Sequence, residues 1–99
     1  MNKDLLREYL DVNCFGKKQA TPSRTLERAL DLSGNEIRKQ VNTLRREAVP
    51  IGSSTEGYFY AETAAEIYTT IRHLEKLRRG LDASIAGLEK AMEKFGDLS

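Results

Sequence analysis

One stretch decides the fold of this chain: residues Ser33–Tyr60, with the sequence SGNEIRKQVNTLRREAVPIGSSTEGYFY. Ser33 and Glu36 have the S-x-x-E spacing of a capping box, in which each side chain bonds the backbone N–H of the other residue. A helix is therefore predicted to begin there. Apolar residues then recur at the spacing of one buried helical face: Ile37, Val41 and Leu44. Pro50 ends this helix, because the residue before a proline avoids the helical conformation.

A polar tip between two short β-type runs predicts a hairpin after this helix. The first run, the tip and the second run are Val49–Ile51, Ser53–Glu56 and Tyr58–Ala61, with Gly52 and Gly57 at the joints. Alternation along the second run puts Phe59 on one face and two tyrosines, Tyr58 and Tyr60, on the other. A strand this short does not show which of its faces is buried, and burial of Phe59 is favoured.

The N-terminal region is predicted to form a helix from Lys3 to about Asp11. Its apolar residues share one face: Leu5, Leu6, Tyr9 and Leu10. A break in this pattern predicts a loop over residues 13–18. Cys14 lies in the loop and is the only cysteine of the chain, so we expect it to be a small buried apolar group. A short strand near Gln19–Ala20 is expected to pair with the hairpin.

A second helix is predicted from about Pro22 to Leu30. Thr21 is a good helix cap, and proline is tolerated at the first helical position, where its missing N–H costs nothing. The residues expected to face inward are Leu26, Ala29 and Leu30. Leu32 is expected to pack beneath the corner between this helix and the next.

A long helix, about 50 Å in length, is predicted from Thr63 to Phe95. Nine of its residues fall at alternating steps of four and three, and we call them the seam: Ile67, Ile71, Leu74, Arg78, Leu81, Ile85, Leu88, Met92 and Phe95. Every seam residue except Arg78 is apolar, which is typical of a coiled coil. Arg78 resembles the single polar core residue that fixes register at some cost in stability.

No small domain covers so long a seam, so pairing with another copy of the chain is expected. One flank of the seam is acidic, with Glu75, Asp82 and Glu89, and the other carries Leu77, Ser84 and Ala91. These flanks offer no complementary charges that would select a parallel pair. A homodimer is favoured, and a four-helix or higher assembly is the alternative.

Charge is distributed unevenly along a chain whose net charge is only +1. Residues 17–46 carry eight basic and three acidic side chains, a net charge of +5, whereas residues 50–99 carry six basic and eight acidic ones, a net charge of −2. Such asymmetry places a cationic face on one part of a fold. The alternative is chance, because 31% of the residues are charged.

Several classes of protein are excluded on composition and motifs. No apolar run approaches the roughly 18 residues of a membrane span, and the N-terminus lacks a signal-peptide core, so we expect a soluble cytoplasmic protein. A single cysteine allows no intramolecular disulfide. His73 is the only histidine, and no phosphate-binding loop or nucleophile motif is present. We therefore expect no catalysis, no cofactor, no metal site and no small-molecule ligand.

The chain resembles a winged helix-turn-helix domain of the biotin-repressor-like kind. It is similar to small phage- and prophage-encoded DNA-binding proteins that follow the wing with a long helix. The motifs that carry the resemblance lie within residues 20–62: SRTLERALDLSGNEIR, LRREAVPI and GYFY. Asp31 and Ala48 stand where the family often has glycine, and the wing tip has neither Lys nor Arg. Asp tolerates the left-handed conformation better than most residues.

The resemblance implies a mainly α fold with a small β-wing. The winged helix-turn-helix domain is expected over residues 1–62, a long C-terminal oligomerisation helix over 63–95 and a tail over 96–99. The implied function is sequence-specific binding of double-stranded DNA by a homo-oligomer, as a transcriptional regulator or a phage replication-associated factor. The alternative is a protein–protein adaptor, or a phage assembly or packaging component, built on the same fold.

The candidate DNA contacts follow from the third helix and the charge distribution. Residues in its first turns are expected at base edges: Asn35, Arg38, Lys39 and Asn42. Basic residues farther along the helix or outside it are expected at phosphates: Arg45, Arg46, Arg24, Lys17 and Lys18. In the wing, the hydroxyls of Ser53 and Ser54 are expected to reach phosphates. A solvated charged face on a structural helix is the alternative interpretation.

Overall fold

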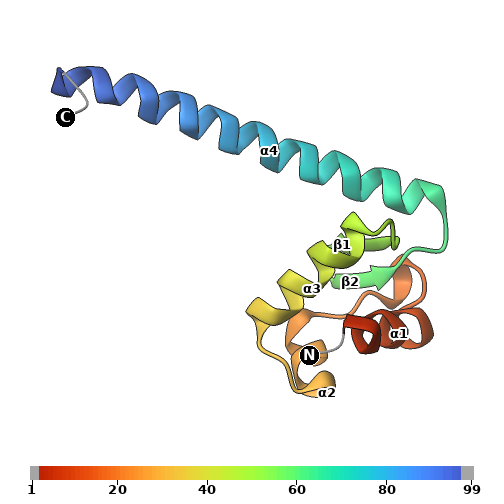
Figure 1. Ribbon diagram of the computed structural model, residues 1–99. Coiled ribbons are helices and arrows are strands. Elements are labelled where there is room, and N and C mark those ends of the chain that lie inside the picture. Colours follow the sequence, from red (N-terminus) through yellow and green to blue (C-terminus); the bar gives the residue numbers. More distant parts are fainter. Residues whose placement is uncertain (1–2, 97–99) are drawn as a thin grey trace.

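Three short helices, a two-stranded hairpin and one long helix follow one another along the chain (Figure 1). The computed structural model describes residues 3–96, so Met1, Asn2 and most of the predicted tail lie outside the described residues. The elements are α1 (Lys3–Asn13), a 3-10 turn η1 (Lys17–Gln19), α2 (Ser23–Leu30), α3 (Gly34–Arg46), β1 (Ile51–Ser54), β2 (Gly57–Tyr60), α4 (Ala64–Met92) and a 3-10 turn η2 (Glu93–Phe95). This order confirms the predicted mainly helical class.

The corner between α2 and α3 forms as its sequence predicts. Asp31 ends α2 in the left-handed conformation, with φ 55°, and its N–H donates to the Glu27 carbonyl. Ser33 N–H donates to Glu36 Oε1 at 3.0 Å, and Glu36 N–H donates to Ser33 Oγ at 3.1 Å, which completes the capping box. The bond from Ser33 N–H, followed by a hydrogen bond from the Ser33 side chain, holds the pKa of the Glu36 carboxyl below its ordinary value. The start of α3 is therefore fixed by side chains adjacent to it in sequence.

The main core lies between α1, α2, α3 and β1. Its buried residues are Leu6, Leu10, Cys14, Leu26, Leu32, Ile37, Val41, Leu44 and Ile51. The predicted inward stripe of α3 and the burial of Cys14 and Leu32 are confirmed. Two inward predictions are wrong: Leu5 is 52% exposed and Ala29 is also exposed. Both short helices bury a narrower stripe than predicted, because a single row of residues spaced three or four apart faces the core.

Thr21 does not cap α2, contrary to prediction. The helix begins one residue later than predicted, at Ser23, and Pro22 occupies the cap position without a side-chain bond. Thr21 is instead extended: its N–H donates to the Tyr58 carbonyl at 2.8 Å and its carbonyl accepts from Tyr58 N–H at 2.9 Å. The strand expected at Gln19–Ala20 is thus reduced to one bridge at Thr21 that follows the 3-10 turn η1.

The hairpin has a shorter tip than its sequence predicts. Ser53 pairs with Tyr58 and Ser54 with Gly57, which leaves two residues, Thr55 and Glu56, in the turn instead of four. Gly57 has a φ of 130°, and a Cβ there would overlap the Thr21 backbone. Glycine therefore allows the strand to pair up to the turn while Thr21 packs against its other side.

Phe59 is buried, as favoured, but it does not enter the main core. Its ring lies over Gly52, where a Cβ would overlap it, and faces the pocket beneath α4. Tyr58 and Tyr60, on the opposite face of the strand, are half-buried against the main core. The hairpin is therefore covered on both faces, by the helical domain on one and by the beginning of α4 on the other.

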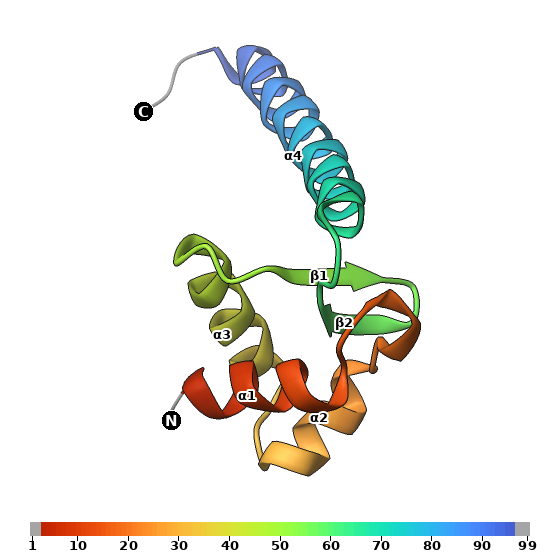
Figure 2. The same ribbon diagram turned by 90° about the vertical axis from the view of Figure 1, so that its right-hand side faces the viewer.

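The long helix α4 crosses the hairpin and then leaves the domain (Figures 1 and 2). Thr63 caps it, and the 3-10 turn η2 extends it to Phe95, in agreement with the predicted limits. The radius of gyration is 17.2 Å, compared with about 13 Å for a compact chain of this length. Beyond Leu77 the apolar seam residues are largely exposed, with Leu81 at 65% and Phe95 at 82%. This part of the seam has no cover within one copy of the chain.

Ala48, which follows α3, provides a test of the backbone geometry. It has a φ of 66°, a conformation that costs a non-glycine residue about 1–2 kcal/mol. We expect Ala48→Gly to raise the free energy of unfolding by about 1 kcal/mol, since part of that gain is offset by glycine's greater freedom in the unfolded chain. The exposed helical Ala29→Gly is the control, and urea denaturation should show it destabilised by a similar amount. A destabilised Ala48→Gly variant contradicts this geometry.

Candidate nucleic-acid interface

A groove of about 540 Å³ lies where α3, the hairpin and α4 meet. Most of its lining comes from three elements: Arg38, Asn42 and Arg45 of α3, Ser53, Ser54 and the tip of the hairpin, and His73, Leu74 and Leu77 of α4. Pro22 and Ser23, at the start of α2, complete it. It brings together five of the residues predicted to contact DNA. Because α3 and the hairpin form two walls of one concave surface, they can contact the same extended ligand.

The outward face of α3 is polar and cationic over its whole length. The capping box and the buried stripe of Ile37, Val41 and Leu44 fix the rotation of the helix. Five predicted contact residues are consequently exposed: Asn35, Arg38, Lys39, Asn42 and Arg46. Arg38 Nη2 donates to Asn35 Oδ1 at 3.2 Å, which holds the guanidinium along the helix surface and leaves most of its donors available.

Arg45 does not point outward, contrary to prediction. It is half-buried, its Nε donates to the Ile51 carbonyl at 2.9 Å and its Nη2 donates to Ser53 Oγ at 3.2 Å. The turn at Pro50 brings β1 back beside the last turn of α3, so the guanidinium is captured by the strand. Burial lowers the pKa of Arg45 from its ordinary value, yet an arginine remains charged at physiological pH. Arg45 fastens the hairpin to α3 with two of its five N–H donors.

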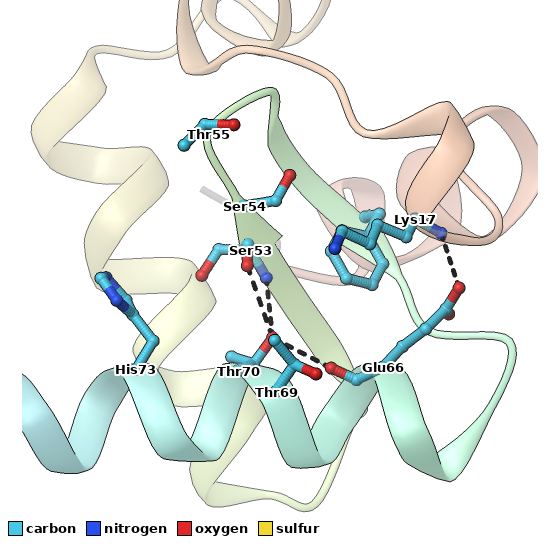
Figure 3. A pocket seen from close by; sticks show the side chains of 9 residues that line it. Lys17, Ser53, Ser54, Thr55, Glu66, Thr69, Thr70 and His73 are labelled. Carbon is cyan, nitrogen blue, oxygen red and sulfur yellow. Dashed lines mark hydrogen bonds between the residues drawn. The ribbon is translucent and has the colours of Figure 1, made fainter.

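Thr70 holds the hairpin from the other side. Its Oγ accepts from Ser53 N–H at 3.2 Å and lies 3.5 Å from the Ser53 carbonyl, as Figure 3 shows. Thr70 is only 4% exposed, although it is polar and lies on the long helix. The sequence gives little sign of this role, because Thr70 lies beside the seam residue Ile71 and looks like any other polar residue next to the seam.

The remaining predicted cations lie outside the groove. Arg24, at the start of α2, and Lys18, in η1, are exposed. Lys17 lines a second pocket of about 320 Å³ between the hairpin and α4, together with Ser53, Ser54 and His73 (Figure 3). His73 lines both pockets, a placement that sequence reasoning missed because its helical phase indicates only an outer face.

Glu66 connects η1 to the start of α4. Its Oε1 accepts from Glu62 N–H at 2.7 Å and its Oε2 accepts from Lys17 N–H at 3.0 Å. The bond from Glu62 N–H, followed by that from Lys17 N–H, holds the pKa of this carboxyl below its ordinary value. This contribution to stability is therefore present at neutral pH and is lost only as the pH falls through the lowered pKa. The carboxylate is engaged by backbone donors and serves the fold.

Comparison with protein-family models, with curated proteins and with solved structures finds no match for this chain. Within residues 3–96, no helix is both long enough and apolar enough to cross a membrane. The same residues contain no group of three His, Cys, Asp or Glu side chains that could hold a metal ion. The site is a polar, cationic helix face beside a hairpin.

Two neighbouring arginines of α3 differ in role, because Arg45 is bonded to the hairpin and Arg46 is exposed. Arg45→Ala removes two hydrogen bonds and leaves the Ile51 carbonyl without its donor, so we expect a loss of about 2 kcal/mol in the free energy of unfolding. Arg46→Ala removes the same charge from an exposed side chain and should change stability by less than about 0.5 kcal/mol. Urea denaturation measures both, and equal effects would contradict the fastening role of Arg45.

Proposed function

We propose that this protein binds double-stranded DNA through α3 and the adjacent hairpin, and that it does so as a homo-oligomer joined through α4. The observation that carries the proposal is the exposed face of α3, where Arg38 and Asn42 line a groove whose other wall is the hairpin. An α-helix fits the major groove of B-DNA, where arginine pairs with guanine and asparagine with adenine. The order helix, corner, helix and hairpin is that of a winged helix-turn-helix module.

Charge supports the same face. Residues 17–46 carry a net charge of +5 in a chain whose total is +1, and these residues include the whole of α3. Neutralising phosphates with Lys and Arg releases counterions, so affinity for duplex DNA falls steeply with salt. In this proposal Lys39 and Arg46 meet phosphates, while Arg38 and Asn42 contact base edges. A regulatory or replication-associated role fits such an activity.

Random-sequence duplex DNA provides the first test. We expect the protein to bind a fluorescein-labelled random duplex at about 50 mM salt, and to lose at least tenfold in affinity at about 200 mM, as anisotropy reports. Binding that does not change with salt, or no binding at the lower concentration, contradicts the proposal.

Arg38 should contribute to specific binding. Once a preferred site has been selected from a random pool, Arg38→Ala should weaken binding to it by roughly 1–3 kcal/mol, because a bidentate contact to a base is lost. Lys94→Ala is the matched control, since it removes one positive charge from the far end of the chain, in η2. Equal affinities of the two variants for the selected site would remove Arg38 from the base-contacting set.

The seam should hold the oligomer together. Leu81 is 65% exposed in one copy and lies at the middle of the seam, so Leu81→Asp places a charge in the proposed interface. We expect sedimentation velocity to show a monomer, while circular dichroism and the urea midpoint of the winged domain stay close to wild type. Ala83→Asp, on the outer face, controls for the added charge. An unchanged sedimentation coefficient for Leu81→Asp contradicts the interface.

One observation favours a second function, that of a protein–protein adaptor or an assembly component. The wing tip is Thr55-Glu56, and the hairpin from Ile51 to Tyr60 contains no Lys or Arg, so its charge opposes approach to a phosphate backbone. An adaptor on this fold would form the oligomer through α4 and show no salt-dependent affinity for DNA. A ring stoichiometry in sedimentation would favour an assembly component.

A further inference from the structure

The uncovered seam of α4 continues into an apolar groove on the winged domain. This groove, of about 270 Å³, lies between the first turns of α4 and the turn after α3. Ile67, Ile71 and Leu74 form its α4 side, and Val49, Pro50 and Ile51 form the opposite side. Ile71 is still 46% exposed and Leu74 39% exposed. The groove and the seam therefore make one surface along α4 that is apolar except at Arg78.

We propose that a second copy of α4 covers this surface in the antiparallel orientation, with the two helices overlapping from end to end. The alternating steps of four and three divide the seam into two rows of residues along the helix. In an antiparallel pair, a residue of one row lies opposite a residue of the other row in the second copy. Full overlap of residues 64–95 gives a single register. Its layers, with one residue from each copy, are Ile67 with Met92, Ile71 with Leu88, Leu74 with Ile85, and Arg78 with Leu81. Every apolar seam residue up to Met92 then has a seam partner.

Arg78 decides against the parallel orientation. A parallel pair in register places each seam residue opposite its own copy, so two guanidinium groups would meet in one layer of the core. The antiparallel register puts Arg78 opposite Leu81. It also places Arg78 close to Asp82 of the second copy. Along the helix axis the two residues are offset by about one residue rise, or about 1.5 Å. The only charged residue of the seam thus gains a carboxylate in the antiparallel pair and a like charge in the parallel pair.

The flanks of the seam favour the same orientation. In a parallel pair the acidic flank of Glu75, Asp82 and Glu89 would face the flank of Leu77, Ser84 and Ala91, and would bury carboxylates beside apolar groups. In an antiparallel pair like flanks face each other. The apolar flanks then pack together, and the two acidic flanks meet where Arg78 of both copies projects, which offsets their repulsion.

The apolar groove completes the fit. In this register Leu88 and Met92 of the second copy lie against Ile71 and Ile67, at the mouth of the groove beside Val49 and Pro50. Met92 is 44% exposed and Leu88 69% exposed in a single copy, so both have area to bury there. The two winged domains consequently lie at opposite ends of the helix pair. This inference names the partner for the oligomer proposed above and rests on that oligomer, but it does not depend on binding to DNA.

Disulfide trapping distinguishes the orientations. The variant carries both Leu74→Cys and Ile85→Cys, which the antiparallel register places opposite each other in different copies. Within one helix these positions are about 16 Å apart, too far for a disulfide. Mild oxidation without DNA should give a covalent dimer on a non-reducing gel, and tryptic mass spectrometry should find residues 74 and 85 joined. Leu74→Cys alone should stay monomeric on the gel. The wild-type chain is the control, because its only cysteine, Cys14, is buried.

The pattern of links gives a decision in each case. A 74-to-85 link in the double variant, with none from Leu74→Cys alone, supports the antiparallel pair. Links of 74 to 74 and 85 to 85 overturn it in favour of the parallel orientation. No link between copies also overturns it, because the proposed register requires these positions to meet. Since DNA is absent, a failure of this test is separable from a failure of the DNA-binding proposal, which anisotropy reports.

Discussion

The structure depends on how the two edges of a short hairpin are closed. A two-stranded hairpin of four residues per strand is at best marginally stable alone, because each strand has one row of unpaired backbone groups. The segment from Cys14 to Thr21 closes the β2 edge, through backbone bonds to Tyr58 and Tyr60. On the β1 edge, Arg45 of α3 binds the Ile51 carbonyl and Thr70 of α4 binds Ser53 N–H. The hairpin is therefore joined to three other elements, and it sets how α3 and α4 lie relative to each other.

This arrangement divides the basic residues of α3 by role. Arg45 is bonded to the hairpin, whereas Arg38, Lys39 and Asn42 are exposed and remain available to a ligand. The same fastening directs α4 across the hairpin and out into solvent, where its seam has no cover. Two surfaces are left exposed in one copy: the cationic face of α3 and the apolar seam of α4 beyond Leu77. In the proposed function, contact with DNA and contact with a second copy therefore involve different parts of the fold.

Much of the fold could be predicted because the signals are local. The Ser33–Glu36 capping box, the left-handed Asp31 and the stripe of Ile37, Val41 and Leu44 are all set by residues a few positions apart. The limits of α4 follow from its cap and its apolar period in the same way. What the sequence did not reveal depends on distant contacts. Thr21 is extended because it pairs with Tyr58, Arg45 turns inward because β1 returns beside it, and Phe59 lies beneath α4 because Gly52 leaves room for its ring. His73 joins the groove only because α4 crosses the hairpin.

In the proposed function, α3 and the hairpin form the face that binds DNA. Amide chemical-shift changes on titration with a random duplex at low salt test it most directly, because they report the binding surface residue by residue. We expect the changes to cluster on the exposed positions of α3, from Asn35 to Arg46, and on the adjacent hairpin. The amides of α1 and of the seam beyond Leu81 should remain unshifted. No shifts at low salt, or shifts confined to α4, would exclude this face as the DNA-binding surface and point to a protein partner.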